Sequence, residues 1–215
     1  MVFKRRKPRT YVEVVSESIY PRGGWRRAVR YVAHRLQRLP DPAHKISRGI
    51  AAGVFASFSP LFGMHFVIAT LVALALRGNV VAALMGTFIG NPVTFPLIAA
   101  VSMELGSWML GQSSLPLPLV LNAFTDASID LWRNLIATFS GGPVHWGGLD
   151  VFWDQVFLPY LVGGLIPGFA AAVATYVLAN PIIATYQKAR VARLKKRFAK
   201  KRERVMSRRL SAPAE

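Results

Sequence analysis

Three long apolar stretches, each interrupted near its middle, constrain the fold of this 215-residue chain more than any other feature. They cover residues 46–76, 80–111 and 156–187, although a membrane-spanning helix needs only about 20 residues. Each contains a proline beside small or polar residues, and proline removes a backbone donor and clashes with the preceding turn. Because freed backbone groups in lipid must find partners in protein or in a wet cavity, the pattern predicts an all-α, helical integral membrane protein with broken or re-entrant helices.

The charged residues are concentrated at the two ends of the chain. Residues 1–48 contain 13 basic and 3 acidic residues, and residues 188–215 contain 12 and 2. The region between them holds only Arg77 and Arg133 against five acidic residues. The formal net charge of the whole chain is +17. Basic flanks mark the cytoplasmic side of a membrane, so we expect both termini in the cytoplasm and an even number of crossings. A uniformly basic nucleic-acid-binding domain would not show this distribution, and no nucleic acid is expected as a partner.

An even number of crossings requires that one apolar stretch turns back. We assign the turn to the first stretch, because its halves around Ser59-Pro60 are each too short to span. The expected order is a re-entrant hairpin, a span, an acidic periplasmic loop and a second span, over residues 46–76, 80–111, 112–155 and 156–187. The alternative makes residues 80–111 the hairpin, folded at Asn91-Pro92, with the first stretch as a full span.

The two basic ends each predict a surface helix. Residues 1–45 form a cytoplasmic arm without the apolar core of a signal peptide. Within this arm, five apolar side chains share one face of a helix: Trp25, Val29, Val32, Leu36 and Leu39. This helix either lies in the membrane interface or packs on the rest of the protein. Residues 188–215 form a basic tail, in which clustered bases just outside a span favour anionic lipid headgroups at about 1 kcal/mol each. The candidate lipid-binding residues are Arg193, Lys195, Lys196, Arg197, Lys200 and Lys201.

Two proline motifs resemble a known family. They are Gly53-Val-Phe-Ala-Ser-Phe-Ser-Pro60-Leu-Phe-Gly63-Met-His65 and, after Arg77-Gly-Asn79, Gly90-Asn91-Pro92-Val-Thr94-Phe-Pro96. Together they resemble the DUF2062 family of bacterial membrane proteins over roughly residues 35–185. The resemblance implies an inner-membrane protein without an assigned activity. His65 stands where many members have Gln, and some relatives are fused to glycosyltransferase-type domains, which hints at lipid or envelope work.

The two motifs also supply the candidate site. Interrupted helices use their free backbone ends to hold ions or anionic groups near the midplane, although the same residues can cap helix ends for purely structural reasons. Glu104 joins the candidate residues because an acid inside an apolar run suggests a proton relay or a counter-ion. Its partner would be His65 or Arg77. Alternatively, its carboxylate reaches the headgroup layer and has no such role. The substrate-lining candidates are Ser59, Pro60, Gly63, His65, Asn91, Pro92, Thr94 and Glu104.

The function suggested by these residues is transport or lipid handling at the two broken helices. The alternative is a non-catalytic membrane scaffold that recruits envelope-synthesis partners. Transport requires a polar cavity between Ser59 and Asn91, whereas a scaffold needs only a closed bundle. We expect no enzyme activity, cofactor or metal, because the chain lacks cysteine and the common catalytic motifs. Three Gly-x-x-x-Gly pairs allow packing within the chain or a homo-oligomer: Gly49/Gly53, Gly86/Gly90 and Gly164/Gly168.

Overall fold

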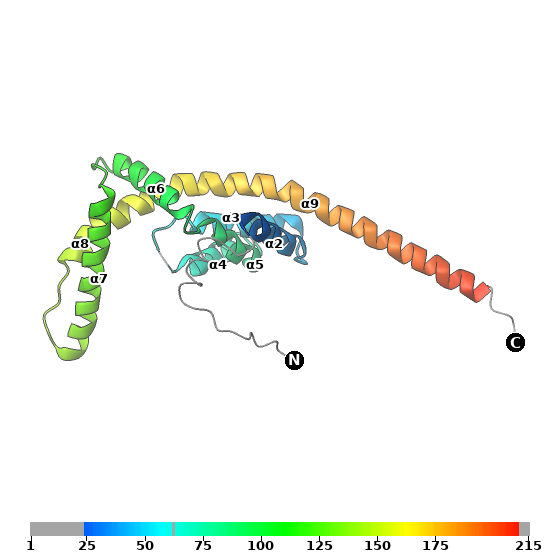
Figure 1. Cartoon of the computed structure of the whole chain (residues 1–215), viewed down its shortest axis with the longest axis horizontal. Coiled ribbons are helices and arrows are strands. Elements are labelled where there is room, and N and C mark those ends of the chain that lie inside the picture. The colour runs from blue at the N-terminus through cyan, green and yellow to red at the C-terminus, as the bar shows by residue number, and fades with distance from the viewer. Residues whose placement is uncertain (1–23, 62, 211–215) are drawn as a thin grey trace.

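The computed structural model describes residues 24–61 and 63–210, and every regular element within them is helical (Figure 1). The all-α prediction is therefore confirmed for this part of the chain. The elements are α2 (Trp25–Gln37), α3 (Ala43–Ala56), α4 (His65–Ala75), α5 (Val80–Gly86), the 3-10 turn η1 (Thr87–Ile89), α6 (Phe95–Met109), α7 (Leu117–Ser140), α8 (Gly147–Phe152), the π-helical turn η2 (Trp153–Phe157) and α9 (Leu158–Leu210). The first half of the predicted basic arm, residues 1–23, lies outside the described residues.

Helices α3 and α4 form a hairpin whose two ends lie together. The backbone N–H of Asn79, just after α4, donates to the carbonyl of Lys45 near the start of α3, at 2.9 Å. The Arg48 guanidinium also reaches the carbonyl of Leu76, at 3.4 Å. Gly63 in the turn has a positive φ of 82°, which glycine adopts without strain. The stretch 46–76 therefore returns to its starting point, which is the geometry that a re-entrant hairpin needs.

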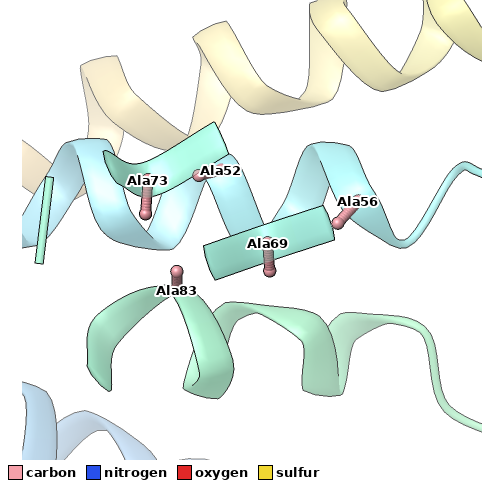
Figure 2. Packing of buried hydrophobic residues seen from close by; sticks show 5 residues of the cluster. All are labelled: Ala52, Ala56, Ala69, Ala73 and Ala83. Atoms are coloured by element: carbon pink, nitrogen blue, oxygen red, sulfur yellow. The ribbon is translucent and has the colours of Figure 1, made fainter. Parts of the chain in front are cut away.

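A core of small side chains joins α3, α4 and α5. Figure 2 shows five buried alanine side chains between these helices, namely Ala52, Ala56, Ala69, Ala73 and Ala83. Two glycines bring the backbones still closer: a Cβ on Gly53 would meet the carbonyl of Ala83, and a Cβ on Gly86 would lie 2.5 Å from the carbonyl of Ile50. All six glycines of the Gly-x-x-x-Gly pairs contact other segments of the same chain. Their predicted role in packing within the chain is confirmed.

Helix α9 is the axis against which α3 and α6 pack, while α4 and α5 pack on α3. It is 53 residues long, or about 80 Å at 1.5 Å per residue, and Figure 1 shows α3, α4 and α5 on one side of it. Helix α6 crosses it so closely that a Cβ on Gly106 would meet the carbonyl of Pro159, and one on Gly163 would meet the carbonyl of Ser102. The continuous run Gly147–Lys200 is the one candidate span in the described chain, long and apolar enough to cross a membrane.

One expectation about the third apolar stretch was wrong. The break was predicted around Pro167, in the glycine-rich segment 163–168, and it is absent. Pro167 and Pro181 both lie inside α9, and neither interrupts the helix. A proline removes one helical hydrogen bond, but the close packing of Gly163 on α6 and of Gly164 on Phe58, just after α3, holds this segment in helical form. The helix continues beyond residue 187 through the basic tail to Leu210, in agreement with the helical spacing predicted there.

The second stretch, residues 80–111, is interrupted where the sequence predicts. Helix α5 and η1 run alongside α3, the chain turns at residues 90–94, and α6 then packs on α9. The interruption separates two short helices with different partners. Neither helix alone has the length of a span, so a crossing by this stretch requires both.

A polar contact ties the open end of the hairpin to α2 and α9. The Asn79 amide donates to the Asp41 carboxylate at 2.5 Å, while its oxygen accepts from the N–H of Ala82 and begins α5. The Gln187 amide donates to the backbone carbonyl of Asp41 at 2.9 Å. Beside it, Leu36 and Leu39 from the α2 region pack on the buried cluster that contains Ala43, Ile46, Ala82 and Ile183. This end of α2 therefore packs on the protein, the second of the two interpretations.

Helices α7 and α8 form a separate unit at the opposite end of the molecule. Figure 1 shows α7 running across the direction of α9. The unit is held by side-chain to backbone hydrogen bonds: Asn134 exchanges two with His145, both at 2.7 Å, and the Asp130 carboxylate accepts from the N–H of Gly148 at 2.7 Å. The acidic loop predicted for residues 112–155 is thus largely a helical pair.

The glycine contacts lead to a stability prediction. In Gly53→Ala the new methyl meets the backbone of α5, which cannot move without displacing η1. We expect a net loss of about 1–3 kcal/mol, even though alanine gains about 0.5–1 kcal/mol in helix propensity. The midpoint of thermal unfolding, followed by circular dichroism in detergent, measures it. The control is Gly147→Ala, where a Cβ has no neighbour within 4 Å; equal midpoints for both variants would contradict the packing account.

Candidate functional site

The two proline-containing breaks lie side by side. Ser57 follows the last turn of α3, and its hydroxyl lies 3.1 Å from the carbonyl of Gly53 and 3.2 Å from that of Thr87 in η1. On the other side, a Cβ on Gly90 would lie 3.0 Å from the Cβ of Ser57. The end of α3 and the end of η1, thirty residues apart in sequence, therefore meet through one buried serine.

The first break is closed by its own residues. The ring Nε2 of His65, half-buried at the start of α4, lies 3.1 Å from the carbonyl oxygen of Ser59 and donates to it. Pro60 is buried, whereas Gly63 is exposed at the tip of the turn. This contact supports a structural role for His65, because it satisfies a backbone carbonyl inside the turn that follows α3.

The second break is organised by Asn91 and Thr94. The side-chain oxygen of Asn91 accepts from the N–H groups of Val93 and Thr94, at 2.9 and 3.2 Å. The Thr94 hydroxyl accepts from the N–H of Asn91 at 3.1 Å and donates to the carbonyl of Ile89. Pro92 is exposed between them. The amides that begin α6 are thus used locally, as in other asparagine-initiated turns.

Helix α9 reaches both breaks through Gly164. A side chain at Gly164 would collide with the carbonyl of Phe58 in the first break, and its Cβ would lie 3.4 Å from the hydroxyl of Ser102 on α6. Gly168, one turn further, packs on the Phe58 side chain. Three segments of the chain therefore converge around one glycine: the first break, α6 and α9.

Two buried hydroxyls at this convergence are not hydrogen-bonded. The Oγ atoms of Ser59 and Ser102 are inaccessible and have no hydrogen-bond partner among the residues that the structure describes. A buried hydroxyl without a partner costs about 1–3 kcal/mol, so an unsatisfied group in a native structure calls for an explanation. Hydroxyl and carbonyl groups are neutral, and what they offer chemically is hydrogen bonding to a polar group that enters between the helices.

The polar groups of the breaks lie next to an apolar surface. Phe88, Val93 and Leu97 flank the second break with exposed fractions of 63%, 57% and 69%, while Asn91 and Thr94 between them are partly exposed. The breaks themselves are packed closed, since Gly90 contacts Ser57. The cavities that the structure forms along α7, of about 510 and 460 Å³, lie elsewhere. We call the region where the first break meets the second, with Ser57 and Gly90 in contact, the seam. It is polar and closed, and it reaches the side of the molecule at Asn91 and Thr94.

Comparison with known proteins agrees with the motifs. Residues 26–192 match the family described as "uncharacterized protein conserved in bacteria (DUF2062)". The chain belongs to this family. No curated protein and no solved structure matches it.

The structure places the predicted DUF2062 site residues in two adjoining breaks that meet through Ser57, except Glu104, which forms no hydrogen bond or ion pair with either break in the described chain. Glu104 is exposed on α6 and forms no ion pair or hydrogen bond within residues 24–61 and 63–210, so neither His65 nor Arg77 is its partner. Arg77 lies at the other end of the hairpin, where its positive φ of 51° closes α4. The candidate lipid-binding bases of the tail are exposed along α9 at Arg193, Lys195, Lys196, Arg197 and Lys200; the side chain of Lys201 is not among those described.

Sequence reasoning missed part of the connection between the breaks. Ser57 was considered as a hydroxyl of the first break that could face the second, and Gly164 as a packing residue, but Thr87 and Ser102 were not among the candidates. Their signal was weak, because a single serine or threonine in an apolar helix usually bonds to its own backbone. Only the fold shows that the Ser57 hydroxyl reaches Thr87.

The Asn91 contacts predict a difference between two substitutions. Asn91→Leu leaves the N–H groups of Val93 and Thr94 without their acceptor, which should cost about 1–2 kcal/mol, as for other lost helix caps. Asn91→Asp keeps that acceptor and loses only the donations at 3.3 and 3.5 Å to the carbonyls of Phe88 and Ile89. We expect the thermal midpoint of the protein in detergent to fall clearly for leucine and little for aspartate. Equal midpoints for leucine and the native chain would exclude a capping role.

Proposed function

We propose that this DUF2062 protein is a multi-pass protein of the bacterial inner membrane that moves phospholipid headgroups along the seam between its two broken helices. Both termini lie in the cytoplasm, α3 and α4 form a re-entrant hairpin from that side, and the α7–α8 unit faces the periplasm. The observation that carries the proposal is the meeting of the two breaks at Ser57, with the unpartnered hydroxyls of Ser59 and Ser102 beside them.

The topology is supported by the contacts at the two ends of the molecule. Asp41, Lys45, Asn79 and Gln187 meet at the end that also carries the basic segments, which the positive-inside rule assigns to the cytoplasm. Helix α5 with α6 then leads outward, and α9 leads back. On this topology the two breaks lie at one depth within the bilayer.

A lipid is a better substrate for this seam than a soluble molecule. A soluble substrate needs an enclosed path, whereas Asn91 and Thr94 are partly exposed beside large apolar side chains. A headgroup could bond to hydroxyl and carbonyl groups in the seam while its acyl chains stay in the surrounding hydrocarbon. Because the seam is packed closed by Ser57 and Gly90, movement of a headgroup requires these residues to separate.

The closed packing also favours the second candidate, a non-catalytic scaffold. A scaffold would keep the breaks closed at all times and use the helix surfaces and basic ends to recruit envelope-synthesis partners. The two candidates therefore differ on one point, which is whether Ser57 must move away from Gly90.

A disulfide across the breaks tests this point. The chain contains no cysteine, so Ser57→Cys/Gly90→Cys introduces a single pair, with 3.0 Å between the Cβ positions against about 3.5–4.5 Å in disulfides. Vesicles of phosphatidylethanolamine and phosphatidylglycerol carry a short-chain fluorescent phosphatidylethanolamine, and albumin extracts it from the outer leaflet. With the native chain or the reduced variant, we expect albumin to extract the fluorescent lipid of the inner leaflet as well as that of the outer leaflet. With the oxidised variant, the fluorescent lipid of the inner leaflet should stay in the vesicles.

The matched control is a disulfide that does not join the breaks. Ala137→Cys/Gly142→Cys places the pair at the end of α7, with 3.8 Å between the Cβ positions, and should extract equally in both redox states. Extraction by the oxidised break variant at the reduced rate would contradict the lipid-moving function. A native chain that leaves the inner pool untouched would contradict it as well, and either result would favour the scaffold.

A further inference from the structure

Helix α7 has three distinct faces. A narrow stripe of mostly small residues, including Ala123, Ala127 and Ala137, is buried. Most of the opposite face carries large exposed apolar side chains, and a polar edge separates the two. The apolar face contains Leu121, Ile129, Leu131, Trp132, Leu135, Ile136 and Phe139, and the polar edge contains Asn122, Asp126 and Arg133. Asp130 is buried beside this edge, and Phe124 is partly exposed and packs on Phe152.

The apolar face is built for contact with hydrocarbon. Its two hydroxyl residues, Thr125 and Ser128, bond to the carbonyls of Leu121 and Phe124 in their own helix, at 2.9 and 2.7 Å, so their hydroxyl donors are already used. Helix α7 runs across α9 at the end away from the basic tail (Figure 1), and a helix crosswise to a span lies along the bilayer surface. Exposed tryptophans, which favour the interface, occur on the same unit at Trp132, Trp146 and Trp153.

Two shallow cavities, both open to the outside, meet on this helix at Ile129 and Arg133. One, of about 510 Å³, is lined largely by apolar groups, including Phe124 and Trp132. The other, of about 460 Å³, is lined by Asp126 and Asp130 together with Gly147 and Gly148 of α8. An apolar surface and a charged pocket therefore adjoin, with one guanidinium at their boundary.

The charges at this boundary are of both signs and are not paired with one another. Arg133 is the one Lys or Arg within residues 112–155, and in the described structure it has no ion-pair partner. One oxygen of Asp130 is used by the N–H of Gly148, whereas the Asp126 side chain is exposed. Asp126 lies two turns before Arg133, and helical side chains lean toward the N-terminus, so the Arg133 head extends toward Asp126.

We infer that this patch binds the headgroup of a zwitterionic phospholipid, phosphatidylethanolamine, in the outer leaflet. The phosphate lies on the Arg133 guanidinium, the ammonium lies on the Asp126 carboxylate, and an acyl chain covers the exposed side chains of Ile129 and Trp132. A headgroup without an ammonium, such as that of phosphatidylglycerol, fits less well, because it leaves the Asp126 carboxylate uncompensated beside its phosphate. The inference uses the membrane placement proposed above but not the separation of the breaks.

Native mass spectrometry of the detergent-purified full chain tests this site. The probe is an equimolar mixture of phosphatidylethanolamine and phosphatidylglycerol, and the readout is the bound fraction of each lipid. Arg133→Gln should lower bound phosphatidylethanolamine about tenfold, since charge-assisted hydrogen bonds to phosphate are lost. Asp126→Asn should lower phosphatidylethanolamine severalfold and leave phosphatidylglycerol unchanged or increased. Asp154→Asn, an exposed acid outside both cavities, is the control and should match the native chain.

The outcomes separate this site from its alternatives. Native levels of bound phosphatidylethanolamine in Arg133→Gln would overturn the site, and equal losses of both lipids in Asp126→Asn would overturn its preference for a zwitterion. A dimer mass that disappears in Trp132→Ser would overturn it too, because a second copy of the chain would then cover the face. If the native chain does not move lipid in the disulfide experiment but still binds phosphatidylethanolamine here, only the proposed separation of the breaks is contradicted. The lipid site on α7 is then unaffected.

Discussion

Contact between helix backbones at glycine and alanine is the interaction on which the rest of this structure depends. Gly53 and Gly86 let α3 and α5 touch, Gly106 and Gly163 do the same for α6 and α9, and Gly164 brings α9 onto the first break. In lipid there is no hydrophobic drive to bring helices together, so close packing of small residues supplies much of the attraction. Short helices of 7 to 15 residues can then be held at fixed positions beside one long helix.

Such packing leaves a second requirement, because every helix that ends inside the protein exposes backbone groups. The structure meets it with a few polar side chains at the helix ends. The Ser57 hydroxyl lies within hydrogen-bond distance of the carbonyls of Gly53 and Thr87. Asn91 and Thr94 organise the start of α6, and His65 donates to the carbonyl of Ser59. The hydroxyls of Ser59 and Ser102, which lack this compensation, lie where the two breaks and α9 converge. A seam with spare hydrogen-bonding capacity inside apolar surroundings is the physical basis for the proposed handling of headgroups.

The sequence predicted what depends on local chemistry and missed what depends on contacts between distant segments. Proline within apolar runs predicted the turns at Pro60 and Pro92, because a lost backbone donor acts locally. The same rule failed at Pro167, where packing of Gly163 and Gly164 on neighbouring helices keeps α9 intact. Glu104 was selected because it lies inside an apolar run, but which face of α6 it occupies depends on where α9 packs. The contact of Ser57 with Thr87 likewise required the fold, since thirty residues separate the two.

The central claim is that both breaks lie at one depth within the bilayer while the open end of the hairpin stays at its surface. The direct measurement is the depth of nitroxide labels on single cysteines, read from collisions with oxygen and with a water-soluble nickel chelate. Suitable exposed positions are Met64 in the first break, Val93 in the second and Arg77 at the end of α4. The account predicts that labels at 64 and 93 are similarly deep and protected from nickel, while the label at 77 is exposed to it. A label at 64 or 93 that nickel reaches as freely as the label at 77 would contradict the account.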